Sequence, residues 1–352
     1  MMTEQLSSRA WLVLPRLRVQ NANAISSPLT WGFPAITAFT GFMTALERRL
    51  KPETGVAFFR VGVICHGFES QVTQGGYTRS FHLTRNPVLQ DGSTAAIVEE
   101  GRVHLDVTLV FEVELTSSSA LLGDAERAQL AARIGDVVAG MRLAGGSVMP
   151  PLPGTLRHPP RPQLVLVSDN GEARRTDFRK LSRRWLPGFA LVSRDDLLQA
   201  RLIELQQTVP AATLLDAWLD LSRLNHHAVR HPTPVEKDGE KTDETTETIE
   251  WVTDKRLGWT VPMPVGFAAL SALYAPGTVA GVRDPNVPFQ FVESVYSIGQ
   301  WISPHRLGDV NDLLWEPVHD AATGLYRCVN DFHAPALPAA PAAPSFPLSQ
   351  TN

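Results

Sequence analysis

Apolar and polar residues alternate along the first part of the chain in a way that predicts both strands and helices. Alternation typical of strands occurs over three stretches, residues 10–20, 56–68 and 103–115. Apolar residues recur at helical spacing over two others, residues 39–50 and 126–141. The order β-α-β-β-α predicts an α+β fold over residues 1–150, with an antiparallel sheet of the RRM-like (ferredoxin-like) type.

The pattern beyond residue 150 indicates a second part in which helices and strands are mixed. Prolines cluster between Pro151 and Pro162, which is typical of a linker. The stretches that follow read as a strand, two helices and an aromatic-rich run of strands and turns, over residues 163–168, 193–209, 213–226 and 251–332. We therefore predict a second α/β part over residues 151–333 that folds back on the body.

Two segments have a biased composition. Residues 232–250 contain seven acidic and two basic residues and almost no apolar ones, so we expect an exposed acidic loop that adds nothing to a core. From Pro335 onward, proline stands at every third position five times, which favours polyproline II and excludes a helix. Residues 334–352 are therefore expected to form a Pro-rich disordered tail.

Composition narrows the class of protein. Hydrophobic residues make up 43% of the chain and charged residues 19%, and no apolar run approaches the roughly 20 residues that cross a bilayer. The N-terminal apolar stretch is interrupted by Pro15, Arg16 and Arg18, so it does not resemble a secretory signal. Only two cysteines, Cys65 and Cys328, are present, without zinc-site spacing. We expect a cytoplasmic protein with no membrane contact.

Charge bears on nucleic-acid binding through its distribution. The formal net charge is -4, but outside the acidic segment 232–250 basic residues slightly outnumber acidic ones. Residues 174–184 contain six basic residues and one acidic residue, with Phe178 interleaved and Trp185 next in the chain. If this stretch is helical, three arginines share a stripe that suits phosphates, and the alternative is a solvated or salt-bridged helix face. These are Arg175, Arg179 and Arg183.

The first strand has a polar face where a core strand would be apolar. Alternation puts Arg16, Arg18 and Gln20 on one side, and a loop rich in amides and hydroxyls follows. Such groups bond base edges, phosphates and 2′-hydroxyls of single-stranded RNA, and Trp31 or Phe33 could stack a base. The alternative is an ordinary solvated face followed by a turn. The other candidates in this stretch are Asn21, Asn23, Ser26, Ser27 and Thr30.

Arg85 and Asn86 stand in a turn that follows a predicted hairpin at residues 76–81, and such a hairpin could grip a nucleic-acid strand. Alternatively, Arg85 ties the turn to a carboxylate such as Glu99 or Glu100. Both interpretations remain open from the sequence.

A glycine pair, Gly145 and Gly146, stands close behind the second predicted helix and next to Arg142. Glycine lets the backbone approach a ligand closely, or ends a helix with a positive φ. The end of the helix is the simpler interpretation of this pair taken alone.

The residues that usually carry catalysis or bind metals do not form a recognisable set. His226 and His227 are adjacent rather than one helical turn apart, and no HExxH, GxSxG or Walker A motif is present. We therefore expect no catalytic site, no metal and no cofactor. The alternative is a ribonuclease in which a histidine such as His66 activates a ribose 2′-hydroxyl. His82 and His104 also lie in the predicted RNA-binding part.

Five long blocks of sequence resemble the second Csy subunit of subtype I-F CRISPR complexes. They stand in the order of that family, from near the N-terminus to about residue 332. The blocks are residues 14–42, 81–105, 141–150, 183–194 and 303–315.

The resemblance implies an RRM-like protein of the RAMP superfamily that binds the 5′ handle of the guide RNA (crRNA). It implies a heterodimer with the large Csy subunit, contact with the adjacent backbone subunit, and a part in antiviral DNA targeting. Target DNA near the protospacer-adjacent motif is a further candidate partner. In that family a separate endonuclease cuts the guide RNA, so the resemblance implies no nuclease activity here.

Carried onto this sequence, the resemblance implies handle contacts in three places: Arg16 to Trp31, Arg85 with Asn86, and Arg142 with Gly145 and Gly146. Two other interpretations remain open. One is a RAMP-type endoribonuclease that processes crRNA precursors, and the other is an adaptor without nucleic-acid contact.

Overall fold

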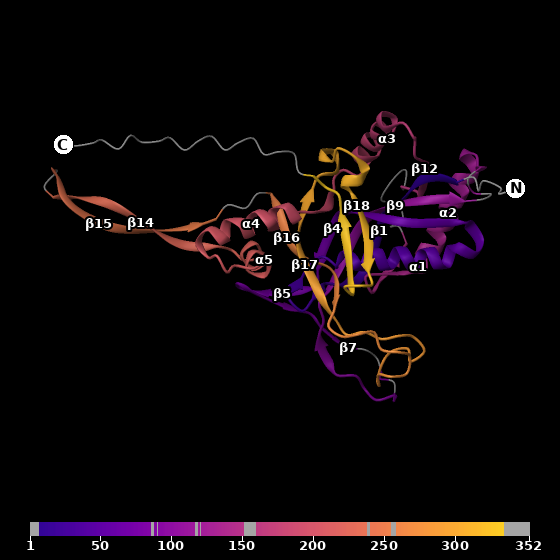
Figure 1. Cartoon of the computed structure of the whole chain (residues 1–352), viewed down its shortest axis with the longest axis horizontal. Helices are drawn as coiled ribbons and strands as arrows, with labels where there is room; N and C mark the ends of the chain where they lie inside the picture. Colours follow the sequence, from indigo (N-terminus) through magenta and orange to yellow (C-terminus); the bar gives the residue numbers. More distant parts are fainter. Residues whose placement is uncertain are drawn as a thin grey trace.

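The computed structural model (Figure 1) shows helices and strands mixed along the chain around a large antiparallel sheet. The residues that it describes are 7–85, 88–89, 91–116, 119, 121–150, 160–237, 240–254 and 258–333. Within them, eleven strands belong to one sheet and five α-helices surround it. This confirms the α+β class.

The first half of the sheet is built from three long strands. β1 pairs with β9, β9 pairs with β4, and the far edge of β1 takes β12 at one end and β11 at the other, all antiparallel. The bounds are β1 Ser7–Asn23, α1 Ile36–Thr54, β4 Val56–Ser70, β9 Arg102–Thr116, α2 Asp124–Ala139, β10 Arg142–Leu143, β11 Gly146–Met149 and β12 Gln163–Leu166. The strand order is therefore β12/β11–β1–β9–β4.

Both faces of this sheet are covered along the first half of β1. Leu12 and Leu14 lie in one core cluster with side chains of α1 and α2, such as Phe39 and Ile134. Trp11, Val13 and their neighbours on the other face lie in a second cluster with α3. Burial on both faces accounts for the continuous apolar run at residues 10–14, so the alternation predicted over residues 10–20 holds only after Leu14.

The second part of the chain continues the same sheet. β13, β17, β16, β19 and β18 follow β4 in order, and β18 returns to pair with Val61 and Gly62 of β4. The bounds are α3 Gly171–Arg184, β13 Phe189–Ser193, α4 Asp195–Thr208, α5 Leu214–Ser222, β16 Trp259–Ala269, β17 Val292–Ile302, β18 Leu314–Asp320 and β19 Leu325–Asn330, with 3-10 turns at Pro304–Arg306 and Val310–Asp312. Strands from both sides of residue 150 thus join one sheet, and the domain boundary there stays a prediction.

Short hairpins project from this body. In Figure 1 the arm that carries β7 lies at the opposite edge of the molecule from α3, and β5 lies between them below α5. The bounds are β2 Ile25–Ser27, β3 Thr30–Trp31, β5 Val72–Gly75, β6 Thr78–Phe81, β7 Leu83–Arg85 and β8 Ile97–Glu99. The β5–β6 hairpin confirms the turn predicted at residues 76–81.

The acidic segment differs from the expectation of a loop. β14 (His226–Lys237) and β15 (Glu240–Thr253) pair as an antiparallel hairpin that extends away from the body beside α4 and α5 (Figure 1). Charge excludes such a segment from a core but does not prevent backbone pairing, and recurring β-branched residues such as Val229, Thr248 and Ile249 favour strands. The linker residues 151–159 and the tail 334–352 lie outside the described part.

Candidate nucleic-acid interface

Two bulges in β1 mark the polar end of the sheet. The pairing of β1 with β9 shifts register between Leu14 and Leu17 and again between Val19 and Ala22. Arg16 and Asn21, at the two shifts, have positive φ values of 53° and 58°. A bulge leaves its extra residue unpaired and re-aims its side chain. Arginine is uncommon in this conformation, whereas asparagine tolerates it better.

The arginines at this end have partners inside the protein. The Arg16 guanidinium donates to Asp106 Oδ2 at 2.9 Å, and its backbone N–H donates to Thr108 Oγ1 at 3.1 Å. Arg18 stands directly across from Asp106 in β9 and donates to the carbonyl of Pro150 at 3.2 Å. Arg16 and Arg18 therefore share a side of the sheet, as the alternation predicts, and one carboxylate offsets part of their charge.

Gln20 and Asn21 are the exposed amides of this region. Gln20 pairs with Ser147 of β11, and the N–H of Asn21 donates to Nδ1 of His104 at 3.2 Å. Neither amide side chain has a hydrogen bond among the described residues, so both face solvent with their donors and acceptors open.

The loop after β1 is a small hairpin whose polar side chains bond one another. Asn23 accepts from the N–H of Ile25 at 3.1 Å and donates to its carbonyl at 2.8 Å. The hydroxyls of Ser26 and Ser27 lie 2.7 and 2.6 Å from that of Thr30. These bonds hold the β2–β3 turn, which is the alternative interpretation of these residues.

The two aromatic candidates have different surroundings. Trp31 remains 50% exposed and meets Phe81 edge-on, with ring centroids 5.6 Å apart. Phe33 instead stacks on Phe39 and contacts Trp301 in the core. Of the two, Trp31 offers a ring surface to a ligand.

The glycine pair lies beside this polar end and not at a helix end. α2 ends at Ala139 and is followed by Gly140, whereas Gly145, with φ 77°, forms the β10–β11 turn. A Cβ on Gly146 would lie 2.6 Å from both the nitrogen of Ala22 and the oxygen of Gln20. The interpretation of the pair as a helix end is therefore wrong, because close approach to β1 requires the second glycine.

Arg142 and Arg85 reach the edges of this region. The Arg142 guanidinium donates to the carbonyl of Gly145 within the hairpin. In the arm, Glu100 accepts from Arg102 and Thr84 at 2.8 Å each, and the alternative in which Arg85 is tied to Glu99 or Glu100 is not formed. Arg85 is exposed and forms no ion pair with the residues that the structure describes; Asn86 lies outside them.

The basic stretch 174–184 lies in α3, so the condition for its arginine stripe, a helical conformation, is met. Phe178 is fully buried against Trp11 and Trp185, with ring centroids 6.3 and 6.0 Å apart. Arg175, Arg179 and Arg183 are exposed on α3. The interleaved aromatics Phe178 and Trp185 do not share this outer surface, because both pack into the second core cluster.

The geometry can now be compared with known proteins. A family model described as CRISPR-associated protein (Cas_Csy2) matches residues 12–328. The chain belongs to the CRISPR-associated Csy2 family. A curated relative, CRISPR-associated protein Csy2 of Pseudomonas aeruginosa (strain UCBPP-PA14), is 46% identical over 321 residues, which cover 90% of this chain and 94% of the relative. These matches confirm the resemblance to the second Csy subunit of type I-F CRISPR systems, and the place in antiviral defence that it implies.

His66 in this Csy2-family chain is a bonded structural group. Its Nδ1 lies 2.8 Å from the carbonyl of Pro187 and its Nε2 2.8 Å from Thr108 Oγ1. Burial lowers the pKa of His66, and the nearby Arg16 lowers it further. Nδ1–H donating to Pro187 and Nε2 accepting from Thr108 satisfy both nitrogens of a neutral ring. Neither nitrogen is left over to act as a base.

Three polar residues of β9 at this end were missed as site residues in the sequence. His104, Asp106 and Thr108 alternate with buried Leu105 and Val107. The same alternation that singled out Arg16 to Gln20 would have found them, because β1 and β9 are neighbours in an RRM-like order. Asp106 is the one with the clearest effect, since it holds Arg16.

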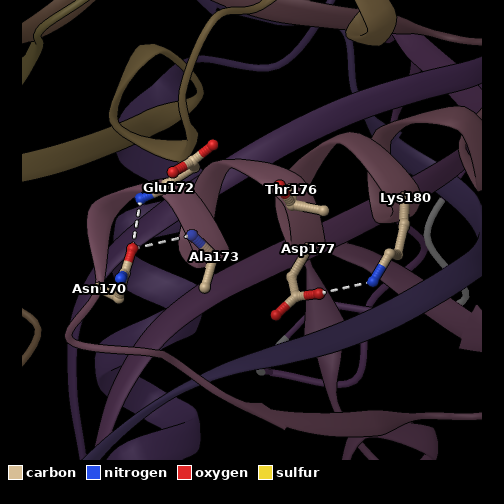
Figure 2. A pocket seen from close by; sticks show the side chains of 6 residues that line it. All are labelled: Asn170, Glu172, Ala173, Thr176, Asp177 and Lys180. Atoms are coloured by element: carbon tan, nitrogen blue, oxygen red, sulfur yellow. Dashed lines mark hydrogen bonds and ion pairs between the residues drawn. The ribbon is translucent and has the colours of Figure 1, made fainter.

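A hollow on the outer side of α3 carries no ligand chemistry of its own. Figure 2 shows Asn170 accepting from the backbone amides of Glu172 and Ala173, which caps the helix, and Asp177 paired with Lys180 at 3.1 Å. The polar side chains of Asn170, Asp177 and Lys180 are thus bonded to one another or to the helix. Among the described residues, no cluster of His, Cys, Asp and Glu could hold a metal, and no helix is long and apolar enough to span a membrane.

Proposed function

We propose that this Csy2-family chain is a non-catalytic subunit of the type I-F Csy complex that binds the crRNA 5′ handle at the polar end of its sheet. The observation that carries the proposal is the pair of bulges in β1. They leave Arg16, Gln20 and Asn21 without a pairing partner in β9, and the loop that follows β1 carries the exposed ring of Trp31. Bulges are common next to functional sites because they turn side chains toward a ligand.

The fold that goes with this proposal is RRM-like, of the RAMP type. Its support is the strand order β12/β11–β1–β9–β4 with α1 and α2 on one face, since a β-α-β-β-α-β chain places its fourth strand beside its first and its third beside its second. α3 covers the other face over Trp11 and Val13. The handle therefore meets the end of the sheet at residues 16–31, rather than crossing its centre.

The side chains there suit single-stranded RNA. The free amides of Gln20 and Asn21 each offer donors and an acceptor to base edges, and the ring of Trp31 offers a stacking surface. Arg18 supplies a cation for the backbone, and the β10–β11 turn at Gly145 adds main-chain groups without a side chain in the way. Arg85 and Asn86 extend the contact along the arm.

Catalysis is not part of the proposal because the candidate base is engaged. His66 holds Thr108 and the Pro187 carbonyl, so activation of a ribose hydroxyl would first break two hydrogen bonds. The alternative, processing of crRNA precursors, would need another group of this region to act as the base.

Partner subunits complete the proposal. α5 buries Ala217 and Trp218, while Leu215 and Leu219 remain about half exposed. Large apolar side chains exposed together on a helix are typical of a protein interface, which supports docking of another protein here. We assign this role to the large Csy subunit, with the adjacent backbone subunit as a second neighbour of the handle.

The test is RNA binding by the chain co-purified with its large-subunit partner, with an intact and a scrambled 5′ handle, across a salt series. The double variant Gln20→Ala/Asn21→Gly removes both amides, and glycine keeps the positive φ at residue 21. We expect the preference for the intact handle to fall on the order of ten-fold. Gln129→Ala, an exposed amide on α2, is the matched control and should leave it unchanged.

Two results would overturn the proposal. One is equal binding of both RNAs by the unaltered complex. The other is cleavage of a repeat RNA by the chain, which would establish the ribonuclease alternative.

A further inference from the structure

The outward surface of α3 differs from the polar end of the sheet in what it offers. Arg179 and Arg183 are exposed and form no ion pair with the described residues, whereas Arg175 reaches Asp309 at 3.7 Å and keeps 63% of its side chain exposed. The turn at Pro304–Arg306 lies against α3 and adds Arg306, which is also exposed. Hereafter we call Arg175, Arg179, Arg183 and Arg306 the basic ridge.

The basic ridge lacks exposed aromatic rings on which single-stranded bases could stack. The aromatic residues of this segment, Phe178 and Trp185, are buried at 0% and 4% exposure. Single-strand binding depends on aromatic rings that stack splayed bases, as well as on cations. A surface of guanidinium groups without exposed aromatic rings supplies mainly phosphate contacts, which favours a nucleic acid whose bases are already paired.

The ridge is also held rigidly. Phe178 and Leu181 anchor α3 in the core cluster that contains Trp11 and Val13, and Asn170 caps its first turn. Arg175 and Arg183 are eight residues apart, which corresponds to about 12 Å along the helix axis. One strand of a double helix presents a phosphate every ~3.4 Å, so this length faces about three or four phosphates.

We propose that the basic ridge binds the phosphate backbone of a nucleic-acid double helix, independently of its sequence. Duplex DNA is the source we expect, and duplex RNA shares the same chemistry. The inference rests on the proposed membership of the complex and not on handle binding. It separates the ridge from the handle site, although the sequence alone placed both groups of arginines together as RNA-binding.

The experiment measures binding of a labelled DNA duplex of random sequence to the purified complex that already contains its guide RNA, across a salt series. The variant is Arg179→Gln/Arg183→Gln. The matched control is Arg48→Gln/Arg49→Gln, which removes two exposed charges from α1 on the other face of the sheet. A second arm uses an RNA duplex of the same length.

We expect the ridge variant to weaken duplex binding about ten-fold and to lower the slope of log affinity against log salt by about two, because each lost phosphate contact removes ~0.9. The α1 control should change neither. The arm with the larger loss identifies the source as DNA or RNA. Equal behaviour of the ridge variant and the α1 control would overturn the inference.

Guide-RNA retention and handle preference are measured on the same preparations. These two readouts show whether the ridge inference or the handle proposal has failed. Unchanged handle preference with weakened duplex binding supports both. Lost handle preference with unchanged duplex binding overturns the ridge inference, because it would return these arginines to the handle site. If the unaltered complex shows no handle preference but the ridge variant still loses duplex binding, only the handle proposal fails.

Discussion

The polar end of the sheet and the basic ridge of α3 both present arginines, but they do so in opposite settings. At the sheet end, Arg16 is bonded to Asp106, and the same stretch of chain carries the open amides of Gln20 and Asn21 and the exposed ring of Trp31. On α3, Arg179 and Arg183 stand on a regular helix with their aromatic neighbours buried beneath them. The first setting mixes groups that read bases, and the second supplies charge alone.

This difference teaches that a local count of basic and aromatic residues does not define a nucleic-acid site. The density of arginine is higher in residues 174–184 than in residues 16–31, yet the sparser stretch has the open amides and the open ring. Which groups face outward decides between reading bases and holding a backbone.

The largest effect is expected from a substitution that removes the packing of α3, which carries the basic ridge, against the sheet. Phe178→Ala removes a fully buried ring between Trp11 and Trp185 and should lower the free energy of unfolding by about 3–5 kcal/mol. Urea denaturation checks this. Arg179→Gln, on the same helix but exposed, should change stability by less than about 0.5 kcal/mol. Equal effects of the two would contradict the anchoring of α3.

Substitutions in the β10–β11 turn should destabilise the polar end of the sheet without affecting α3. Gly146→Ala brings a Cβ within 2.6 Å of backbone atoms of Ala22 and Gln20, so β1 or β11 must shift, at a cost of roughly 2–3 kcal/mol. Gly145→Ala meets no neighbour within 4 Å and pays only for its positive φ, about 1 kcal/mol. Thermal unfolding should therefore rank Gly146→Ala below Gly145→Ala, and the reverse order would refute this close approach.

A smaller change should affect RNA binding alone. Trp31→Ala removes an exposed ring and should weaken binding of the intact handle by about 1–3 kcal/mol while leaving duplex binding unchanged. Trp251→Ala, on β15 and 63% exposed, is the matched control and should leave both unchanged. Anisotropy titrations measure each affinity. An equal loss of handle binding by the two variants would contradict the proposed stacking role of Trp31.

The smallest expected effect concerns His66, which joins the two regions by bonding Thr108 at the sheet end and Pro187 after α3. Burial lowers its pKa in the folded state, so the unfolded chain takes up the proton first as pH falls below about 6.5. Stability from this group is complete above that pH and declines below it, until the folded state also binds the proton. His66→Gln should flatten the fall in melting temperature between about pH 7 and 5. An unchanged profile would exclude this linkage.

Much of the architecture could be predicted because it depends on local periodicity. The strands β1, β4 and β9 and the helices α1, α2, α4 and α5 coincide largely with stretches whose apolar spacing indicated them, whereas a helix at α3 was only a condition of its basic stripe. The stripe of Arg175, Arg179 and Arg183 follows from helical spacing in the same way. The five sequence blocks also predicted the family, and the matches confirm it.

Contacts between distant segments escaped prediction. The burial of Phe178 depends on Trp11, and the need for Gly146 depends on Ala22 and Gln20, neither of which is its neighbour in sequence. The bonds of Arg16 to Asp106 and of His66 to Pro187 likewise cross the sheet. The hairpin of residues 226–253 formed although its charge predicted a loop, because backbone pairing does not require apolar side chains.

The sequence by itself therefore determined the elements, the family and the polar or basic character of each stretch, since these depend on residue type and short-range spacing. Only the tertiary structure decided which side chains face solvent, which are bonded and which segments lie together. The physical reason is that burial and pairing depend on the opposite surface, and that surface comes from residues far away in the chain.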